Sequence, residues 1–401
     1  MKRPRRRRPR AARYRDGRPA LGALLQRGLA RAAEAPLVGG NAVAVLIDGP
    51  EVYPAMLERI AGAMRCVHLE NYIFRADAAG RRFGAALAER ARAGVQVRVL
   101  YDWLGSFRTA GSFWRELRAA GCDVRAFGPP TLRDPRAFFR RDHRKLLVVD
   151  GRTAVTGGLC IGDEWDDGEH VRCWRDTAIA LEGPVCRELD RSFHRMWRLS
   201  GGVAALDEPP VRGAGTVVAR VVDGPPAHAR AYRLYQLIAA TAEATLYVTG
   251  AYPLAPAPLR SALAAAARAG VDVRLLVPGR SDLPVLNQAA RAHYAALLRA
   301  GIRIFEWSGP MLHAKTVVAD GRIALVGSSN LNPFSLMGSY ELDVEVQDTD
   351  VAGQLERQFL SDLGRAREIT PDAWHRRPRA QRWRERLGAV ALWMPYRLYS
   401  G

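Results

Sequence analysis

Lysine is nearly absent from this chain. Of its 60 basic residues only three are lysine, at positions 2, 145 and 315, and all the others are arginine. A composition so inclined to arginine gives no reason of its own for lysine at the two internal positions. Lysine presents a compact point charge, whereas arginine presents a wide planar fork. Lys145 and Lys315 are therefore candidates for a role that arginine fills poorly.

Long apolar runs are also missing. No stretch reaches the ~18 apolar residues that a membrane-spanning helix needs, and the N-terminus lacks the apolar region of a secretory signal. The five cysteines contain no CxxC pair, so we expect free thiols in a reducing compartment. These absences predict a cytosolic protein, or one that binds a membrane from the cytosolic side.

Acidic residues do not balance the basic ones. The net charge is +19, and residues 2–15 hold nine basic residues without an acid. We expect this tail to be disordered and solvated. An excess of this size favours anionic partners, which include a membrane surface, nucleic acid and phosphorylated substrates.

Two segments of the chain repeat one pattern. HRKLLVVDGRTAVTGG begins at His143, and HAKTVVADGRIALVGS begins at His313. In both, Lys follows His by two positions, Asp follows Lys by five, and a final Gly-containing pair starts seven positions after Asp. The flanks repeat as well, since ARAGVQVRVLYDW from Ala91 matches ARAGVDVRLLVPG from Ala267. The rare lysines thus mark a duplicated site.

Each half of the chain alternates predicted strands with predicted helices before its HxK segment. The helical stretches have apolar periodicity and end at glycine, and the strands are short β-branched runs. This pattern predicts an α/β fold of two pseudo-symmetric halves, each a mixed, mostly parallel sheet covered by helices. We expect a basic disordered tail and lead-in at 1–36, a first domain at 37–205, a second at 206–370 and a basic amphipathic extension at 371–401.

The C-terminal extension has a helical apolar stripe flanked by arginines. Its members recur at i, i+4, i+7 and i+11: Trp383, Leu387, Val390 and Met394. Together with Trp393 and the basic tail, this helix is expected to lie on an anionic bilayer without spanning it. The alternatives are that the helix is packed core and that the tail only aids solubility.

The chemistry suited to paired histidines and lysines is transfer of a phosphoryl group. One imidazole can attack phosphorus and form a covalent intermediate, while a second protonates the leaving oxygen and later deprotonates the incoming one. Lysine beside each supplies positive charge for the phosphoryl oxygens. This requires the two halves to bring both histidines to one cleft.

Both segments resemble the HxKxxxxD signature of the phospholipase D superfamily. The flanks LENYIF and WRDTAIALEGP are most similar to bacterial cardiolipin synthases of the short type without N-terminal membrane helices. The resemblance covers roughly residues 37–370. It implies two phospholipase D-like domains with the active site at their interface, a phosphatidyl-histidine intermediate, and neither metal nor cofactor. The implied activity is a phosphatidyltransferase that joins two phospholipids into cardiolipin.

The resemblance also assigns site residues. The catalytic set that it implies, with His143 as nucleophile and His313 as acid and base, is His143, Lys145, Asp150, His313, Lys315 and Asp320. It implies phosphate binding by Asn330, Ser328 and Cys160, and orientation of the histidines by Asp176 and Glu341. Cys160 departs from the family pattern, because Asn330 is its counterpart in the second half.

Some of these residues have a plainer interpretation. Asp150 and Asp320 precede Gly-Arg, so they are alternatively turn residues. Asp176 and Glu341 are alternatively ordinary acids at strand edges. The remaining histidines are expected to be structural or solvated.

The expected partners are anionic phospholipid substrates, namely phosphatidylglycerol and in addition phosphatidylethanolamine. We expect a monomer, peripheral on the cytoplasmic side of the bacterial cell membrane, and no binding of nucleic acid. One alternative is a phosphodiesterase that hydrolyses phospholipid or nucleic acid, which a charge of +19 suits equally well. Another is an inactive module that binds anionic membranes, for which Cys160 is the only hint.

Overall fold

The computed structural model describes residues 22–130, 140–166, 173–203, 210–378, 381–383 and 385. The first half contains β1 (Val38–Ile47), α2 (Asp48–Ala61), β2 (Cys66–Asn71), α3 (Ala78–Arg92), β3 (Gln96–Asp102), α4 (Gly111–Ala119), β4 (Asp123–Phe127), β5 (Arg141–Asp142), β6 (Lys145–Val149), β7 (Thr153–Gly157), η2 (Asp163–Trp165), β8 (Thr177–Glu182) and α5 (Val185–Leu199).

The second half repeats this order. It contains β9 (Val217–Gly224), η3 (Pro226–His228), α6 (Arg230–Thr241), β10 (Thr245–Thr249), α7 (Ala257–Arg268), β11 (Asp272–Pro278), α8 (Pro284–Arg291), α9 (Tyr294–Arg299), β12 (Arg303–Trp307), β13 (Thr316–Ala319), β14 (Ile323–Gly327), α10 (Pro333–Gly338), β15 (Ser339–Gln347), α11 (Thr349–Leu363) and β16 (Ala366–Ile369). Helix α1 (Ala23–Ala33) precedes the first half, and α12 (Pro371–Arg376) follows the second.

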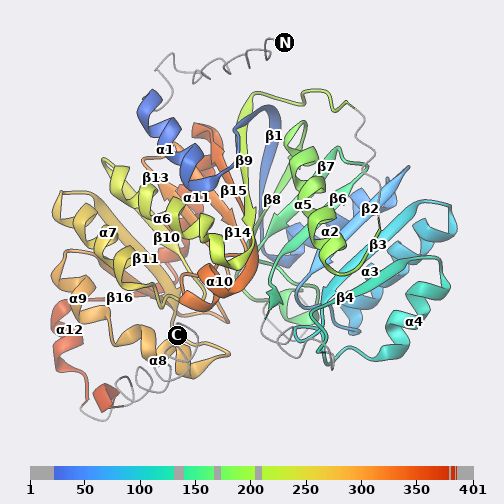
Figure 1. The fold of residues 1–401 in the computed structure, drawn as a ribbon. Coiled ribbons are helices and arrows are strands. Elements are labelled where there is room, and N and C mark those ends of the chain that lie inside the picture. Colours follow the sequence, from blue (N-terminus) through green and yellow to red (C-terminus); the bar gives the residue numbers. More distant parts are fainter. Residues whose placement is uncertain are drawn as a thin grey trace.

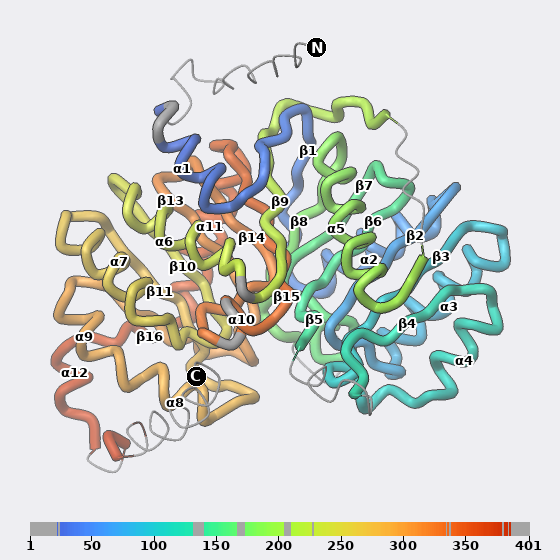
Figure 2. The backbone as a smooth tube through the Cα atoms, in the orientation of Figure 1, coloured from blue at the N-terminus to red at the C-terminus, as the bar shows by residue number. Residues whose placement is uncertain are grey.

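The strands form one continuous path through both halves. Its order is β4-β3-β2-β6-β7-β8-β1 in the first half, continuing as β9-β15-β14-β13-β10-β11-β12-β16 in the second. Apart from the edge strand β16, the two orders mirror each other about the β1–β9 contact. Figure 1 shows the first half on the right and the second on the left, with helices around both, and Figure 2 shows β1 beside β9 at their junction. The predicted α/β class and two-half arrangement are confirmed.

The structure corrects one detail of that prediction, because neither half is mostly parallel. Along the path only β2–β3–β4 and β10–β11–β12 pair in parallel, and the other pairings along it are antiparallel. The reason lies in the repeated Asp-Gly. Asp150 and Gly151 have φ of 54° and 65°, the positive values of a two-residue hairpin that returns β7 antiparallel to β6. Asp320 and Gly321 do the same between β13 and β14.

Local sequence explains how the parallel strands are connected. Helix α3 begins after Asp77, whose carboxylate accepts a 3.0 Å hydrogen bond from the Gly80 amide. The helix ends before Gly94, which has a φ of +86° that suits glycine. Phe83 and Leu87, four positions apart, are fully buried on one face of the helix. The chain then enters β3 parallel to β2.

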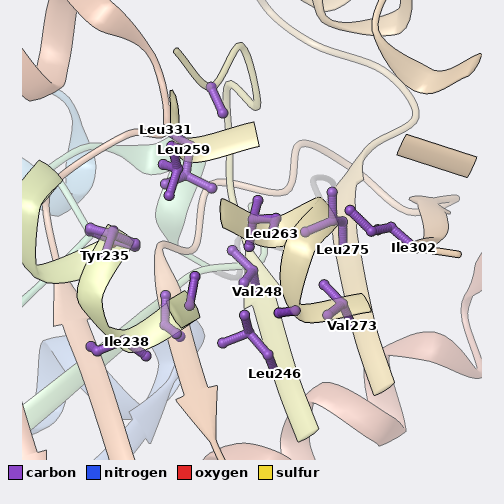
Figure 3. Close-up of a cluster of buried hydrophobic side chains, with 14 of the residues drawn as sticks. Tyr235, Ile238, Leu246, Val248, Leu259, Leu263, Val273, Leu275, Ile302 and Leu331 are labelled. Carbon is purple, nitrogen blue, oxygen red and sulfur yellow. The ribbon is translucent and has the colours of Figure 1, made fainter. Parts of the chain in front are cut away.

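Buried apolar side chains form separate cores within and between the halves. Figure 3 shows the second-half core, where helices α6 and α7 pack on strands β10 and β11 through the side chains of Tyr235, Ile238, Leu246, Val248, Leu259, Leu263, Val273, Leu275, Ile302 and Leu331. A central core draws on both halves and includes Leu146, Ile179, Val326 and Val344. The halves therefore share buried apolar surface, and their relative position is held by packing as well as by strand pairing.

Both terminal segments contain packed structure. Within the segment 1–36, beyond the basic tail, α1 packs against α6 of the second half, and Leu29 of α1 is fully buried there. Within the C-terminal extension, Trp374 of α12 packs against Tyr294, whereas Trp383 is 63% exposed. Residues 1–21, and the predicted stripe beyond Trp383, lie outside the described residues. Among the residues that are described, no helix has the length and apolarity to cross a bilayer.

Candidate active site

His143 of the first half is held by the second half. The short strand β5 pairs in parallel with β15, and the His143 amide donates a 3.0 Å hydrogen bond to the Tyr340 carbonyl. Its ring Nδ1 lies 3.0 Å from Oε2 of Glu341, the next residue of β15. Since Nδ1 is occupied by this carboxyl, Nε2 is the ring nitrogen left for reaction.

His313 of the second half is held by the first half in the same way. Arg175 and Leu312 form a parallel bridge, and the His313 amide donates a 2.7 Å hydrogen bond to the Arg175 carbonyl. The ring Nδ1 lies 2.7 Å from Oδ2 of Asp176. Each histidine is thus oriented by an acid from the opposite half, so neither half contains a complete site.

Both imidazoles line one pocket between the halves. Its volume is about 740 Å³, and Cys160, Asn330 and Glu341 also line it. Its walls include the aromatic residues Tyr72, Trp165, Trp174 and Tyr252. The ring centroid of Tyr72 lies 4.8 Å from that of His143, and Trp165 lies 5.5 Å from His313. The arrangement presents two reactive nitrogens to one enclosed space with apolar walls.

The two rare lysines lie behind the histidines. Each ammonium group donates a hydrogen bond to the backbone carbonyl of the histidine two positions before it. Both side chains are almost fully buried, and Nζ of Lys145 lies 5.1 Å from the ring centroid of Tyr72. Burial lowers the pKa of Lys315 to about 8. A compact ammonium suits this enclosed position, whereas a planar guanidinium is bulkier and needs a wider space.

The environment keeps both histidines neutral in the free protein. Burial, with added repulsion from Lys145 and Lys315, holds the pKa of His143 well below its usual range. Burial and Lys315 lower the pKa of His313 to about 4, although Asp176 opposes this effect. An anion bound in the pocket would offset the charge of the two lysines behind the histidines, which would raise the proton affinity of both rings.

The two histidine-bound acids have different surroundings. Asp176 accepts a 3.1 Å hydrogen bond from the Trp165 indole and a 2.8 Å bond from the Thr177 amide. Although burial opposes it, the hydrogen bond with His313 and the charge of Lys315 lower the pKa of Asp176. This acid is therefore ionised at neutral pH.

Glu341 is held by hydroxyl groups. It accepts a 2.5 Å hydrogen bond from Ser328 Oγ and another from Ser335 Oγ. Burial raises its pKa to about 8, against the opposing effects of Lys145 and the two hydroxyls. Nε2 of neutral His143 is free for reaction in the tautomer in which Nδ1 carries the ring proton and donates it to Glu341.

The residues expected to bind phosphate differ between the halves. Asn330 and Cys160 both line the pocket and are buried. The Asn330 side-chain oxygen has no hydrogen-bond partner among the described residues, while burial raises the pKa of the Cys160 thiol. Ser328 is fully buried behind Glu341 and is not among the residues that line the pocket. Its position supports a role in holding Glu341 and gives it no direct path to substrate.

Asp150 and Asp320 are not brought to the pocket. Asp150 follows the five-residue strand β6, which at ~3.3 Å per residue places it about 16 Å from Lys145 at the other end. Its carboxylate accepts hydrogen bonds of 2.8–3.0 Å from the amides of residues 64–66. Asp320 accepts equivalent bonds of 2.7–3.2 Å from the amides of residues 243–245. The geometry favours the turn interpretation over a direct catalytic role.

One group away from the pocket has the composition of a metal site. Among the described residues, the possible ligand atoms of His68, Asp190 and His194 lie within 4.8 Å of one another. The His68 ring is already engaged, since Nδ1 lies 2.6 Å from Asp190 and Nε2 lies 3.3 Å from the Arg98 guanidinium. The Arg98 charge beside this ring disfavours a second cation, so we interpret the group as a buried hydrogen-bond network.

Two residues that line the pocket, Trp165 and Ser335, were not identified from the sequence. Trp165 bonds Asp176 from the segment after β7, and Ser335 bonds both Glu341 and the amide of Asn330, the latter at 2.8 Å. Neither residue belongs to the repeated motif, and no spacing relates Trp165 to His313. The available signal was the equivalence of the two flanks, which points to the residues shortly after each Gly pair.

Comparison with known proteins identifies what this arrangement is similar to. A family model described as "Cardiolipin synthase, PLD-like domain" matches residues 56–197 and 234–363. The chain is 34% identical over 360 residues to a cardiolipin synthase of Geobacillus kaustophilus, covering 87% of this chain and 71% of that protein. It is 30% identical over 383 residues to a probable cardiolipin synthase of Bacillus subtilis, covering 92% and 74%.

Solved structures share the fold at low sequence identity. A phosphatidylserine synthase of Haemophilus influenzae superposes with a TM-score of 0.69 at 13% identity, covering 94% of this chain and 98% of that one. A polyphosphate kinase of Porphyromonas gingivalis gives a TM-score of 0.58 at 14% identity, covering 86% and 52%. At these identities the likeness shows the architecture alone.

Proposed function

This chain belongs to the cardiolipin synthase family and is a phosphatidyltransferase of the phospholipase D superfamily, and we propose that it moves a phosphatidyl group between two phospholipids through His143. The observation that carries the proposal is the reciprocal pairing in one pocket. His143 bonds Glu341, and His313 bonds Asp176, each across the junction of the halves. Two oriented imidazoles are the minimum set for double displacement at phosphorus.

In the first displacement, neutral His143 attacks the phosphorus of the donor lipid through Nε2. A nitrogen–phosphorus bond forms, and the bond from phosphorus to the headgroup oxygen breaks. The departing oxygen takes a proton from His313, which substrate charge and Asp176 hold in the protonated form. Lys145 and Lys315 stabilise the negative charge of the phosphoryl oxygens.

In the second displacement, the acceptor hydroxyl loses its proton to His313, which is now neutral. The acceptor oxygen bonds to phosphorus, and the nitrogen–phosphorus bond breaks, which restores neutral His143. If both donor and acceptor are phosphatidylglycerol, the products are cardiolipin and glycerol. Water in place of the acceptor gives phosphatidic acid, so aromatic walls that exclude water favour transfer over hydrolysis.

We further propose that the enzyme is a monomer that acts peripherally, on the cytoplasmic side of the bacterial membrane. Phosphatidylglycerol is proposed as acceptor, because its headgroup carries free hydroxyls, and phosphatidylglycerol or phosphatidylethanolamine supplies the phosphatidyl group. The net charge of +19 supports attraction to such anionic lipid.

The test is incubation of the purified protein with phosphatidylglycerol vesicles, with and without phosphatidylethanolamine, followed by mass spectrometry of the lipids. We expect cardiolipin, and a matched His143→Ala preparation should yield none. Phosphatidic acid as the sole product would replace transfer by hydrolysis. Turnover of DNA with no lipid product would contradict the proposed substrate class.

A further inference from the structure

Two loops in equivalent positions of the two halves border the mouth of the catalytic pocket. Residues 103–109 follow β3 in the first half, and residues 279–283 follow β11 in the second and lead into the first turn of α8, which carries Val285. β3 and β11 occupy the same place in the two mirrored strand orders. Both loops contribute to the pocket lining, through Leu104 and Phe107 on one side and Leu283 and Val285 on the other.

These loops expose apolar side chains to solvent. Phe107 is 63% exposed, Val285 50% and Leu283 47%. They are three of the eight large apolar side chains that are exposed in the described part of the chain, and they gather at one opening. A grouped apolar rim marks an interaction surface, whereas apolar residues scattered singly need no explanation.

The same rim carries exposed positive charge. Arg108 lines the pocket and follows Phe107, with its guanidinium carbon 5.4 Å from the phenyl centroid. This arginine is exposed. Apolar side chains flanked by arginine suit the boundary of an anionic leaflet, where the chains and the headgroups lie a few ångströms apart.

The size of the pocket explains why such a surface is required. About 740 Å³ is the volume that one drug-sized ligand fills. Two diacyl phospholipids carry four long acyl chains in addition to their headgroups. The pocket has room for the reacting phosphate and headgroup, so the acyl chains have to remain outside its mouth, which is where the apolar rim lies.

We propose that the rim formed by Phe107, Leu283 and Val285 inserts into the acyl region of an anionic leaflet, while Arg108 contacts lipid phosphates. The mouth of the pocket then opens directly onto the bilayer, and the substrates reach the histidines without leaving it. The choice of an anionic lipid leaflet as the partner rests on the proposed function. It assigns docking to the folded halves, separately from the basic tail and the C-terminal extension.

The test is co-sedimentation with phosphatidylglycerol vesicles of Phe107→Ser and of the double variant Leu283→Ser/Val285→Ser. The matched control is Met64→Ser, because Met64 is 81% exposed and lies beside the Asp150 turn, at the end of the sheet opposite the pocket. Measurements in 1 M salt shorten the screening length to about 3 Å and suppress attraction by the basic tail. We expect Phe107→Ser to partition about tenfold less, which is the effect of losing one buried large apolar side chain. The double variant should lose more, because it lacks two such side chains, and the Met64 variant should match the parent.

Binding and turnover are read separately, so failure of this inference is distinguishable from failure of the proposed function. Binding is measured without turnover, and transfer is measured on short-chain lipid dispersed in detergent. Rim variants that bind vesicles as the parent does would overturn the docking surface, even if transfer is observed. Equal loss in the Met64 variant would also overturn it, because the effect would not be specific to the rim. Loss confined to the rim variants supports docking, even if the parent shows no transfer.

Discussion

The two halves present the same histidine motif but hold it with acids in different states. Asp176, which pairs with His313, is bonded by an indole and has a lowered pKa. Glu341, which pairs with His143, is bonded by two hydroxyls and has a pKa near 8. The difference begins with the last residue of each motif, which is Gly158 in one half and Ser328 in the other.

The packing around these two positions shows why they differ. A Cβ atom at Gly158 would lie 2.1 Å from Oδ1 of Asp176, so a serine there would displace the acid. At the equivalent place, the Ser328 hydroxyl itself bonds Glu341. A duplicated site thus acquires two roles through small changes around its acids. An ionised Asp176 stabilises the imidazolium form of His313, which suits an acid and base, whereas His143 needs to stay neutral to attack.

Removing either imidazole is expected to have the largest effect. His143→Ala and His313→Ala should each lower kcat by at least ~10²-fold, the lower end of what general acid–base groups contribute. The measurement is steady-state transfer by each variant on detergent-dispersed lipid, beside the parent. A variant with near-normal rate would contradict a mechanism with two histidines.

Exchanging each acid for its amide sharpens the comparison of the halves. Asp176→Asn removes the charge that stabilises protonated His313, and we expect a loss on the order of 10²-fold in kcat. Glu341→Gln should cost less, about tenfold, because the amide oxygen can still accept a hydrogen bond from Nδ1–H of His143. Equal losses in the two variants would argue that the acids are interchangeable.

Arginine at the lysine positions keeps the charge and changes the shape. Lys145→Arg and Lys315→Arg should each lower kcat/KM about tenfold, because a bulky guanidinium enters a fully enclosed position. The control is Arg152→Lys, the reverse exchange in the turn after Asp150, which should leave the rate unchanged. Normal activity of both arginine variants would make the two lysines incidental.

The pH dependence is the smallest effect that we expect. The pKa of Lys315 is lowered to about 8, so the ammonium is present below that pH and is lost above it. Because the charged form stabilises the phosphoryl oxygens, kcat/KM should fall to about half its plateau near pH 8. The measurement is the pH profile of kcat/KM for the parent and for Lys315→Arg. Because arginine stays charged, the alkaline limb should move to higher pH in the variant. An unchanged limb would assign it to another group.

Much of this architecture follows from local patterns in the sequence. The doubled HxK spacing indicated two related halves, and helical and β periodicity predicted the strands and helices that precede each HxK segment. The antiparallel return at Asp150 was missed, because a hairpin and a parallel crossover begin with the same apolar run. The Asp-Gly pair was the available signal, because its two residues adopt the positive φ values of a tight hairpin turn.

The assembly of the site was not visible in the sequence. Asp176 and Glu341 were identified as partners of the histidines, but the pattern gave no sign that each serves the opposite half. That exchange depends on β5 pairing with β15 and on the bridge between Arg175 and Leu312, both of which join residues more than 130 positions apart. Such pairings are set by packing of the whole chain, and local propensity carries no information about them.

The most direct test of the central claim is to identify the histidine that carries the phosphatidyl group. Acid-free quenching of a single turnover with labelled phosphatidylglycerol, followed by proteolysis and mass spectrometry, locates the adduct. We predict that it lies on His143 in the parent, and that it is absent from His143→Gln. An adduct on His313, or equal labelling of both histidines, would contradict the division of roles between the halves.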